Sequence, residues 1–373
     1  MRFLIINTDY PEFLSSLYSH HVGLHKESFE RQMVARNDSL FGVADFYSRN
    51  LRRIGHEAWD IHANNEVMQK TWAREHGLRV TADLDWQFRL RRGIVPWFFR
   101  IKNQRWFYEI LSEQLKHYKP DVLLNQDMSG IAIDFLREIK PKLRLLVGQH
   151  AATRLPDGDY GCYDLVISSF PPTIDYFRKK GIVAELNRMA FEESMLPGLN
   201  ARGDDLDVSF IGSLSAVHGS RAELLEALCE RVEQLNIWGP SIDGVSADSP
   251  LRRRYMGQAW GRDMYTILRR SKITINHHGD IEPYANNCRM YEATGVGTLL
   301  VTDSKKNLTD MFEPGLEVVT YDSPEECAEV VDYYVDHESE RDAIAASGQR
   351  RTAREHTYSD RMKELSTLVS KYI

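Results

Sequence analysis

The chain has 373 residues, of which 42% are hydrophobic and 27% are charged, and its net charge at pH 7 is −7. This length exceeds what one hydrophobic core usually supports, so we expect two domains. The balanced composition argues against disorder, and the acidic balance argues against general nucleic-acid binding, which needs a basic surface.

The first half of the chain alternates short apolar runs with longer amphipathic stretches. Runs typical of buried parallel strands lie at 3–7, 122–125, 143–148 and 165–168. Helical patterns, each followed closely by Gly or Pro, lie at 26–35, 42–54, 65–76, 106–118, 131–139 and 172–180. This alternation predicts a parallel sheet with helices on both faces.

A basic and aromatic run between Arg89 and Arg105 interrupts this alternation. It combines six Lys or Arg residues with Trp97, Phe98 and Phe99. Cations beside aromatic rings suit an anionic acceptor or a membrane surface, so peripheral membrane contact is one hypothesis. A solvated helix face beside an apolar turn is the plainer interpretation.

A segment rich in Pro, Gly and Asp at 196–206 predicts a linker, and a second α/β series follows it. The predicted fold is therefore α/β, with two Rossmann-like, doubly wound domains that face a central cleft. Its expected strands are 208–211, 235–238, 273–276, 298–301 and 318–320, and its expected helices are 221–232, 264–270, 288–294, 324–337 and 338–356. The predicted limits are 1–196 for the first domain, 197–206 for the linker, 207–356 for the second domain and 357–373 for a final helical segment.

The first candidate site is the strand, polar loop and helix at 207–228. Gly212 and Ser213 in the loop let backbone N–H groups and a hydroxyl approach an anion at the positive end of the helix. His218 and Arg221 add countercharge. A diphosphate seat is one interpretation, and an ordinary turn that uses Gly for its geometry is the other.

The stronger signal for a ligand site lies at 273–303. A predicted strand ends in two histidines, the second being His278, and a polar loop then leads to Asn287, Arg289 and Glu292 on a helix. Arg289 and Glu292 are three residues apart and so share one helix face. The carboxylate can accept hydrogen bonds from a ribose or hexose diol, while Arg289 and the helix start face phosphate.

This pattern, with Asn-x-Arg-x-x-Glu-Ala, Gly, a strand and Thr-Asp in succession, resembles the C-terminal domain of GT-B glycosyltransferases, in particular the CgeB-like group. The resemblance covers 208–365 and, more loosely, 163–181. It implies a nucleotide-sugar donor on the second domain, an acceptor on the first, no bound metal, and a last helix that returns to the first domain. It also implies that Glu292 binds ribose or sugar hydroxyls and that the loop 212–218 lies near the diphosphate.

The chain departs from this family pattern at two places. Many related enzymes carry a second acid where this chain has Tyr284, with Asp280 and Glu282 nearby. They also place Arg and Lys in the diphosphate loop, where this chain has Ser213 and His218 or a neighbour. The candidates for the missing positive charge are Arg221, Arg262 and Arg289.

A general base is expected at the end of a strand in the first domain, where cleft residues of parallel sheets lie. An inverting transferase needs such a group to deprotonate the attacking hydroxyl, and a histidine or a carboxylate serves. His150, after the strand 143–148, is the first choice, although each candidate also reads as a binding or structural group. The other candidates are Asp9, His20, His21 and Asp127.

Other site types have weaker support. Asp-x-Asp triplets at 83–85, 157–159 and 205–207 can chelate a divalent ion, but none directly follows an apolar strand, so we expect no metal. The four cysteines have no metal-type spacing, and the chain lacks the GxGxxG, Walker and GxSxG motifs.

The sequence thus predicts transfer of a sugar from a nucleotide-diphosphate-sugar, such as a UDP- or GDP-sugar, to a glycan, lipid-linked or protein acceptor. No cofactor, metal or nucleic acid is expected to take part. Two alternatives stay open, a nucleotide-sugar epimerase or hydrolase and a non-catalytic binding or assembly protein. Without an apolar run long enough to cross a bilayer or a leader-type cleavage site, we expect a cytoplasmic location.

Overall fold

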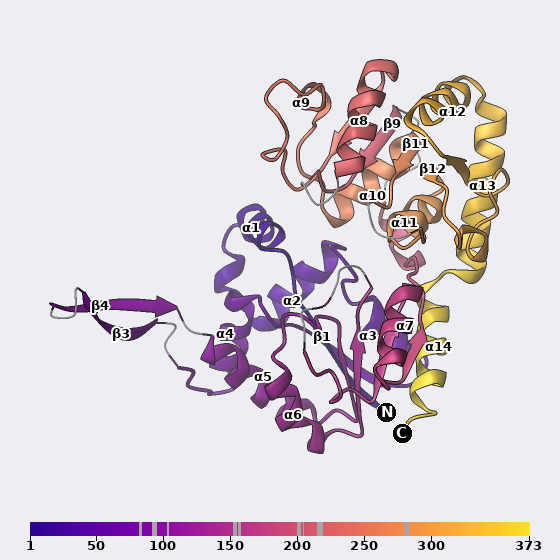
Figure 1. Ribbon diagram of the computed structural model, residues 1–373. Coiled ribbons are helices and arrows are strands. Elements are labelled where there is room, and N and C mark those ends of the chain that lie inside the picture. The colour runs from indigo at the N-terminus through magenta and orange to yellow at the C-terminus, as the bar shows by residue number, and fades with distance from the viewer. Residues whose placement is uncertain are drawn as a thin grey trace.

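The computed structural model contains two parallel sheets flanked by helices and a separate two-stranded ribbon (Figure 1). It describes residues 1–81, 84–91, 95–102, 104–151, 155, 158–199, 203, 205–214, 219–279 and 283–373, with the backbone alone for 84–91 and 95–102. We call the first sheet with its helices the N-terminal domain and the second sheet with its helices the C-terminal domain.

The N-terminal sheet has six parallel strands in the order β2-β1-β5-β6-β7-β8. Its central strands are short and apolar because helices cover both faces, so that Phe3 to Ile6 are fully buried. The strands are β1 (Arg2–Asn7), β2 (Glu57–His62), β5 (Val122–Asn125), β6 (Leu145–Gln149), β7 (Leu165–Ser168) and β8 (Ala184–Leu186). The helices are α1 (Pro11–His20), α2 (Phe29–Asp38), α3 (Phe46–Arg53), α4 (Glu66–Glu75), α5 (Arg105–Tyr118), α6 (Ile133–Ile139) and α7 (Pro171–Lys179).

The C-terminal sheet has five parallel strands in the order β10-β9-β11-β12-β13. The strands are β9 (Leu206–Ile211), β10 (Leu235–Trp238), β11 (Ser271–Asn276), β12 (Leu299–Asp303) and β13 (Val319–Tyr321). The helices of this domain are α8 (Gly219–Arg231), α9 (Leu251–Arg254), α10 (Gly261–Arg270), α11 (Arg289–Val296), α12 (Pro324–Asp336) and α13 (Glu338–Glu355), and α14 (Tyr358–Val369) follows them in the chain. The predicted fold class of two Rossmann-like domains is confirmed.

The structure adds elements that the sequence patterns did not predict. The strand β2 lies at the edge of its sheet and carries Glu57 and Asp60, so it lacks the continuous apolar run of a central strand. The helix α1 directly follows the loop after β1. The interpretation of 89–105 as a helix face is wrong, because β3 (Leu84–Arg91) and β4 (Val95–Lys102) pair as an antiparallel ribbon.

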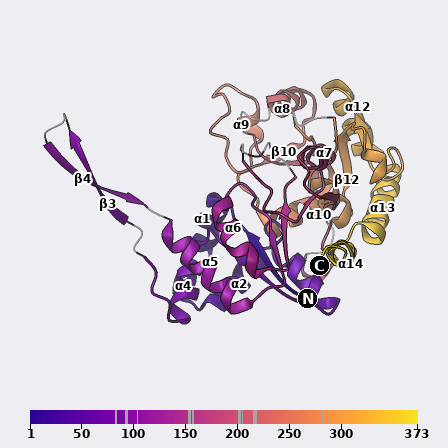
Figure 2. The ribbon, with the colours of Figure 1, turned by 60° about the horizontal axis from the view of Figure 1, so that its bottom comes forward.

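The chain passes from one domain to the other twice, first near Phe191 and again near Thr357, and these two passages pair with each other. The backbone N–H of Phe191 donates to the carbonyl of His356 at 2.9 Å, and that of Tyr358 donates to the carbonyl of Phe191 at 3.0 Å. After the second passage α14 packs against α3 of the N-terminal domain, and the two chain ends lie close together in both views (Figures 1 and 2). The domain limits predicted from the sequence stay a prediction.

Side chains from both domains share one buried cluster around this passage. Phe191 is 2% exposed, and its ring lies 6.3 Å from that of Tyr265 on α10. Gly295 on α11 leaves room for the Phe191 ring, because a Cβ there would stand 2.4 Å from Cγ of Phe191. The position of α11 is therefore set by the passage.

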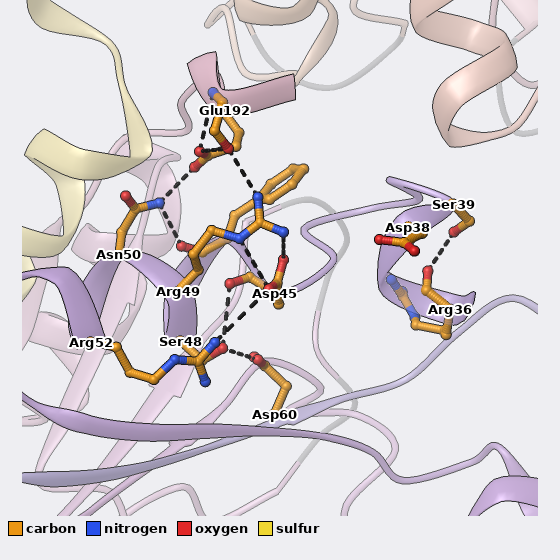
Figure 3. A network of polar contacts seen from close by, with 12 residues as sticks. Arg36, Asp38, Ser39, Asp45, Ser48, Arg49, Asn50, Arg52, Asp60 and Glu192 are labelled. Atoms are coloured by element: carbon orange, nitrogen blue, oxygen red, sulfur yellow. Dashed lines mark hydrogen bonds and ion pairs between the residues drawn. The ribbon is translucent and has the colours of Figure 1, made fainter. Parts of the chain in front are cut away.

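A polar network ties the first passage to α3 (Figure 3). The carboxylate of Glu192 accepts a hydrogen bond from Nδ2 of Asn50 at 2.6 Å and lies 3.5 Å from Nη1 of Arg53. Glu192 is only 2% exposed, so these contacts supply the hydrogen bonds that water would otherwise provide. The first passage is thereby held to the N-terminal domain by charge as well as by packing.

The same network contains a buried carboxyl that lacks a strong countercharge. Asp60 on β2 accepts a hydrogen bond from the hydroxyl of Ser48, and Asp45 lies near it (Figure 3). Burial, reinforced by the Asp45 charge, raises the pKa of Asp60 from 3.8 to about 7, because the Ser48 hydroxyl and Arg52 offset only part of the desolvation. The folded protein therefore binds a proton here near neutral pH.

We expect Gly295→Ala to lower the free energy of unfolding. The better helix propensity of Ala contributes about 1 kcal/mol, but forcing a methyl group into the Phe191 ring costs about 1–3 kcal/mol, with the larger cost favoured by a Cβ distance of 2.4 Å. Thermal melting measures the difference. Gly244→Ala is the control, since nothing lies within 4 Å of a Cβ there, and equal melting temperatures for the two variants would contradict the packing argument.

We expect Asp60→Asn to stabilise the protein above neutral pH. Between about pH 4 and 7 the folded state holds a proton on Asp60 that the unfolded state has lost, so the free energy of unfolding falls as pH rises through this window. Asn keeps an acceptor for Ser48 without the buried charge, which should gain on the order of 1 kcal/mol or more at pH 8. Urea unfolding at several pH values tests this, with Asp332→Asn at an exposed site as control; an identical pH slope in wild type and Asp60→Asn rejects it.

Candidate functional site

Most of the predicted ligand-binding residues of the C-terminal domain that the structure describes gather at the carboxyl ends of β9, β11 and β12. The loop after β9 contains Gly212 and Ser213, and α8 brings Arg221 back toward it. Arg221 donates from Nη1 to the carbonyl of Ser213 at 2.9 Å and from Nη2 to the carbonyl of His277 at 2.8 Å. This guanidinium therefore fastens the loop after β9 to the end of β11.

The start of α11 faces the same loop. Arg289 donates from Nη1 to Oε2 of Glu292 at 2.8 Å and from Nη2 to the carbonyl of Ile211 at 3.2 Å. The hydroxyl of Tyr265 lies 3.4 Å from Oε1 of Glu292. The side chains of Arg289 and Glu292 are each 13% exposed, so the pair is reachable from solvent but largely desolvated. The two segments singled out from the sequence thus meet in space.

His278 is held at the end of β11 by an aspartate that the sequence analysis did not single out as a site residue. Nδ1 of His278 lies 2.6 Å from Oδ1 of Asp303, the last residue of β12, and Lys305 lies 3.1 Å from Oδ2. Burial alone would raise the pKa of Asp303, but the His278 hydrogen bond and the neighbouring cations lower it to about 2. Asp303 is therefore ionised, and its hydrogen bond orients the imidazole. The Thr-Asp pair at the end of the motif was the available signal.

Three buried polar atoms in this cluster have no hydrogen-bond partner among the described residues: Nε2 of His278, Oδ1 of Asn287 and Nε of Arg289. Nδ2 of Asn287 is engaged, since it donates to Oδ1 of Asn276 at 2.7 Å. Buried polar atoms are nearly always paired in folded proteins, so several unpaired ones in one cluster point to a polar ligand or ordered water.

The loop before α11 also contacts the N-terminal domain. Oδ1 of Asn286 accepts a hydrogen bond from the hydroxyl of Ser169 at 2.7 Å, and Nδ2 of Asn286 donates to the carbonyl of Ala151. His150, half-buried, lies next to Ala151 at the end of β6, and its backbone N–H donates to the carbonyl of Ile167 at 3.2 Å. His150 therefore lies where the carboxyl ends of both sheets approach each other.

The structure contradicts Asp9 as the general base. Asp9 is 3% exposed and forms a buried ion pair with Arg36, and Nδ1 of His62 lies 3.3 Å from its Oδ2. Although burial opposes it, the neighbouring His62 and Arg36 hold the pKa of Asp9 well below its usual range. A fully paired carboxylate under α2 cannot reach an acceptor hydroxyl. Burial of this kind is not visible in the sequence.

His21 and Arg262 belong to another part of the molecule. Because α1 intervenes, His21 follows the helix rather than β1, and it is exposed on a pocket of about 1130 Å³ between α1, α2 and the start of α10. Arg262 lines the same pocket and donates to the carbonyls of Gly198 at 3.0 Å and Asp38 at 3.1 Å. Neither residue lines the cluster around Glu292, so His21 as base and Arg262 as diphosphate countercharge stay predictions that this cluster does not support.

Arg262 belongs to a close contact between the domains. Its backbone N–H donates to the carbonyl of Ser39 at 2.7 Å, and the ring of Trp260 lies 5.3 Å from that of Phe41. Gly261 between them has φ +46, and a Cβ there would stand 2.0 Å from the carbonyl oxygen of Ser39. Only glycine permits this approach.

Several residues considered from the sequence lie outside the described residues, namely His218, Asp280, Glu282, Asp83 and Asp157. In the third Asp-x-Asp triplet, Asp205 pairs with Arg270, and Asp207 pairs with Lys272 at 2.6 Å. No group of three or more His, Cys, Asp or Glu residues suited to a metal ion occurs within the described part of the chain. No described helix is both long and apolar enough to cross a membrane.

Comparison with known proteins identifies the fold. Residues 221–367 match the family model described as glycosyl transferase-like. Over the whole chain the structure is similar to HepE from Anabaena, solved in complex with UDP-glucose, at 12% identity and a TM-score of 0.62, with 100% of both chains covered. It is also similar to a glycosyltransferase from Rickettsia africae, at 9% identity and a TM-score of 0.61, with 100% of this chain and 98% of that chain covered.

A third similar structure is AviGT4, a glycosyltransferase involved in avilamycin A biosynthesis, at 13% identity and a TM-score of 0.56, with 100% of this chain and 97% of that chain covered. A search of curated protein sequences found no significant match. These structural similarities establish the GT-B fold, in which two Rossmann-like domains face each other.

We expect Asp303→Asn to destabilise the protein at neutral pH and to flatten its acid unfolding. A carboxyl whose folded pKa is lowered from 3.8 to about 2 contributes stability above that window, and the contribution is lost as pH falls through it. The loss should be on the order of 2 kcal/mol in the wild type and absent in the variant. Asp205→Asn, which removes an exposed ion pair with Arg270, is the control and should change stability far less. If both variants give the same acid profile, the buried pair does not hold His278 as described.

Proposed function

We propose that this protein is a GT-B glycosyltransferase that moves a sugar from a nucleotide-diphosphate-sugar to an acceptor hydroxyl. The observation that carries the proposal is the cluster of buried polar atoms on His278, Asn287 and Arg289 that have no hydrogen-bond partner among the described residues, beside the Arg289–Glu292 pair. This cluster lies within the segment that matches the glycosyl transferase-like model.

In this proposal the donor diphosphate lies between the loop after β9 and the start of α11. The N-terminus of α8 offers N–H groups to phosphate oxygens, whereas the backbone N–H of Gly212 already donates to the carbonyl of Trp238 at 3.0 Å. Arg289 adds positive charge, which stabilises the nucleoside diphosphate as it leaves. Glu292, held by Arg289 and Tyr265, accepts hydrogen bonds from ribose or sugar hydroxyls.

The transfer step breaks the bond between the anomeric carbon and the diphosphate oxygen and forms a bond to the acceptor oxygen. The acceptor proton must leave, and His150, the first choice from the sequence, is the base in this proposal. Its place beside Ala151, which Asn286 contacts from the C-terminal domain, supports this role. Contact of both domains around the reacting groups would exclude water that otherwise hydrolyses the donor.

We further propose a UDP- or GDP-sugar as donor and a reaction without metal or cofactor, in a chain of the CgeB-like group. The UDP-glucose in the HepE structure supports a donor of this class. The pairing of Asp205 and Asp207 with cations supports metal independence, because neither carboxylate is free to chelate a diphosphate-bound ion. The acceptor class, whether glycan, lipid-linked or protein, is to be identified by screening.

We expect Glu292→Ala to weaken donor binding by about 1–2 kcal/mol, because hydrogen bonds to a charged acceptor are lost. Thermal shift first identifies the binding member of a panel of UDP- and GDP-sugars, and calorimetric titration then compares the variants. Glu329→Ala, at an exposed position on α12, is the control. Unchanged affinity in a folded Glu292→Ala protein rejects the site, and no shift with any donor favours a non-catalytic binding protein.

Incubation with labelled donor and no acceptor separates transfer from the other enzymatic possibility. A transferase is expected to leave most of the donor intact until an acceptor is added. Rapid release of free sugar, or conversion to an epimer, in the absence of acceptor would instead identify a nucleotide-sugar hydrolase or epimerase on the same scaffold.

A further inference from the structure

The ribbon of β3 and β4 stands away from both domains. The strands pair only with each other, as an antiparallel sheet separate from the two parallel sheets. Figures 1 and 2, which differ by a 60° rotation, both show the ribbon projecting from α4 and α5 with no other described helix or strand beside it. An isolated two-stranded ribbon is marginally stable in water, so we expect it to pack against a partner. The residue types of the ribbon indicate which kind of partner it suits.

The sequence of the ribbon is aromatic and basic. Its two strands contain one acid, Asp85, against four cations, although the chain as a whole has a net charge of −7. The cations are Arg89, Arg91, Arg100 and Lys102, and the aromatic residues are Trp86, Phe88, Trp97, Phe98 and Phe99. The net charge of the ribbon is therefore positive, whereas that of the whole chain is negative.

The register of the strands mixes the two residue types on both faces. Residues directly opposite each other in an antiparallel pair share a face. Trp86 is paired with Arg100 on one face, and Arg89 is paired with Trp97 on the other. A ribbon made to lie flat on a protein core would collect its apolar residues on one face, whereas here each face combines aromatic and cationic positions.

We propose that the β3–β4 ribbon docks the protein on an anionic lipid surface. Cations near such a surface are attracted to its headgroups, and Trp and Phe prefer the boundary between headgroups and acyl chains. A ribbon with both residue types on both faces suits this boundary, which surrounds an inserted segment on both sides. The charge of the ribbon, opposite to that of the lipid and of the rest of the chain, supports lipid as the occupant. This inference does not rest on the proposed sugar transfer.

The test is flotation of the full chain with vesicles of phosphatidylcholine alone and of phosphatidylcholine mixed with phosphatidylglycerol. The wild type should bind the anionic vesicles and not the neutral ones. Reversing the ribbon charges, in Arg89→Glu, Arg91→Glu, Arg100→Glu and Lys102→Glu combined, should lower the bound fraction at least tenfold. A second variant, Trp86→Ser with Trp97→Ser, should also lower it, because the apolar contribution is lost.

The matched control reverses four exposed cations elsewhere, Lys119, Lys142, Lys179 and Lys371, and should still bind. Melting temperature and donor titration show that each variant is folded, and a ribbon variant that keeps its donor affinity separates this inference from the proposed function. Absence of wild-type binding to anionic vesicles, or binding that survives the ribbon reversal, overturns the proposal. So does a dimer in light scattering that dissociates in the ribbon variants, because a second copy would then be the partner.

Discussion

The backbone pairing of Phe191 with the segment around His356 and Tyr358 is the constraint on which the arrangement of this molecule depends. It joins the two passages between the domains, and the ring of Phe191 then fills the space that Gly295 leaves open on α11. Since α11 carries Arg289 and Glu292 at its other end, packing at the passage fixes where these charges face the loop after β9. The site is therefore positioned by an apolar contact several residues away.

The arginines of the candidate site already have partners without a ligand. Arg221 binds the carbonyls of Ser213 and His277, and Arg289 binds Glu292 and the carbonyl of Ile211. These bonds keep the ends of β9 and β11 and the start of α11 at fixed distances, so a bound anion would meet donors that are already oriented. Preorganisation of this kind lowers the entropic cost of binding a flexible diphosphate.

The sequence predicted those helices and strands whose own residue pattern matches their place in the fold. Central strands such as β5 and β7 are continuous apolar runs, and most helices end at Gly or Pro, so both were found. The edge strand β2 was missed because its polar residues break the run. The ribbon was misread although β3 alternates apolar and polar residues in the manner of a strand, because the apolar run from Val95 to Phe99 in β4 lacks this alternation.

The residues of the candidate site were likewise predictable only where a local pattern points to them. Arg289 and Glu292 were predictable because they lie three residues apart on one helix, and the structure brings Arg289 to the carbonyl of Ile211 at the end of β9. Asp9 was misjudged because its burial and its pairing with Arg36 depend on a helix that begins twenty residues later. The contact of Asn286 with Ala151 joins residues 135 positions apart, and no local sequence pattern predicts it.

Gly261, at the contact between α10 and the end of α2, limits the substitutions that this contact between the domains tolerates. Any side chain at position 261 would collide with the Ser39 carbonyl, so the backbone at this contact between the domains would have to shift. The close approach of the two domains at this point therefore depends on a residue without a side chain.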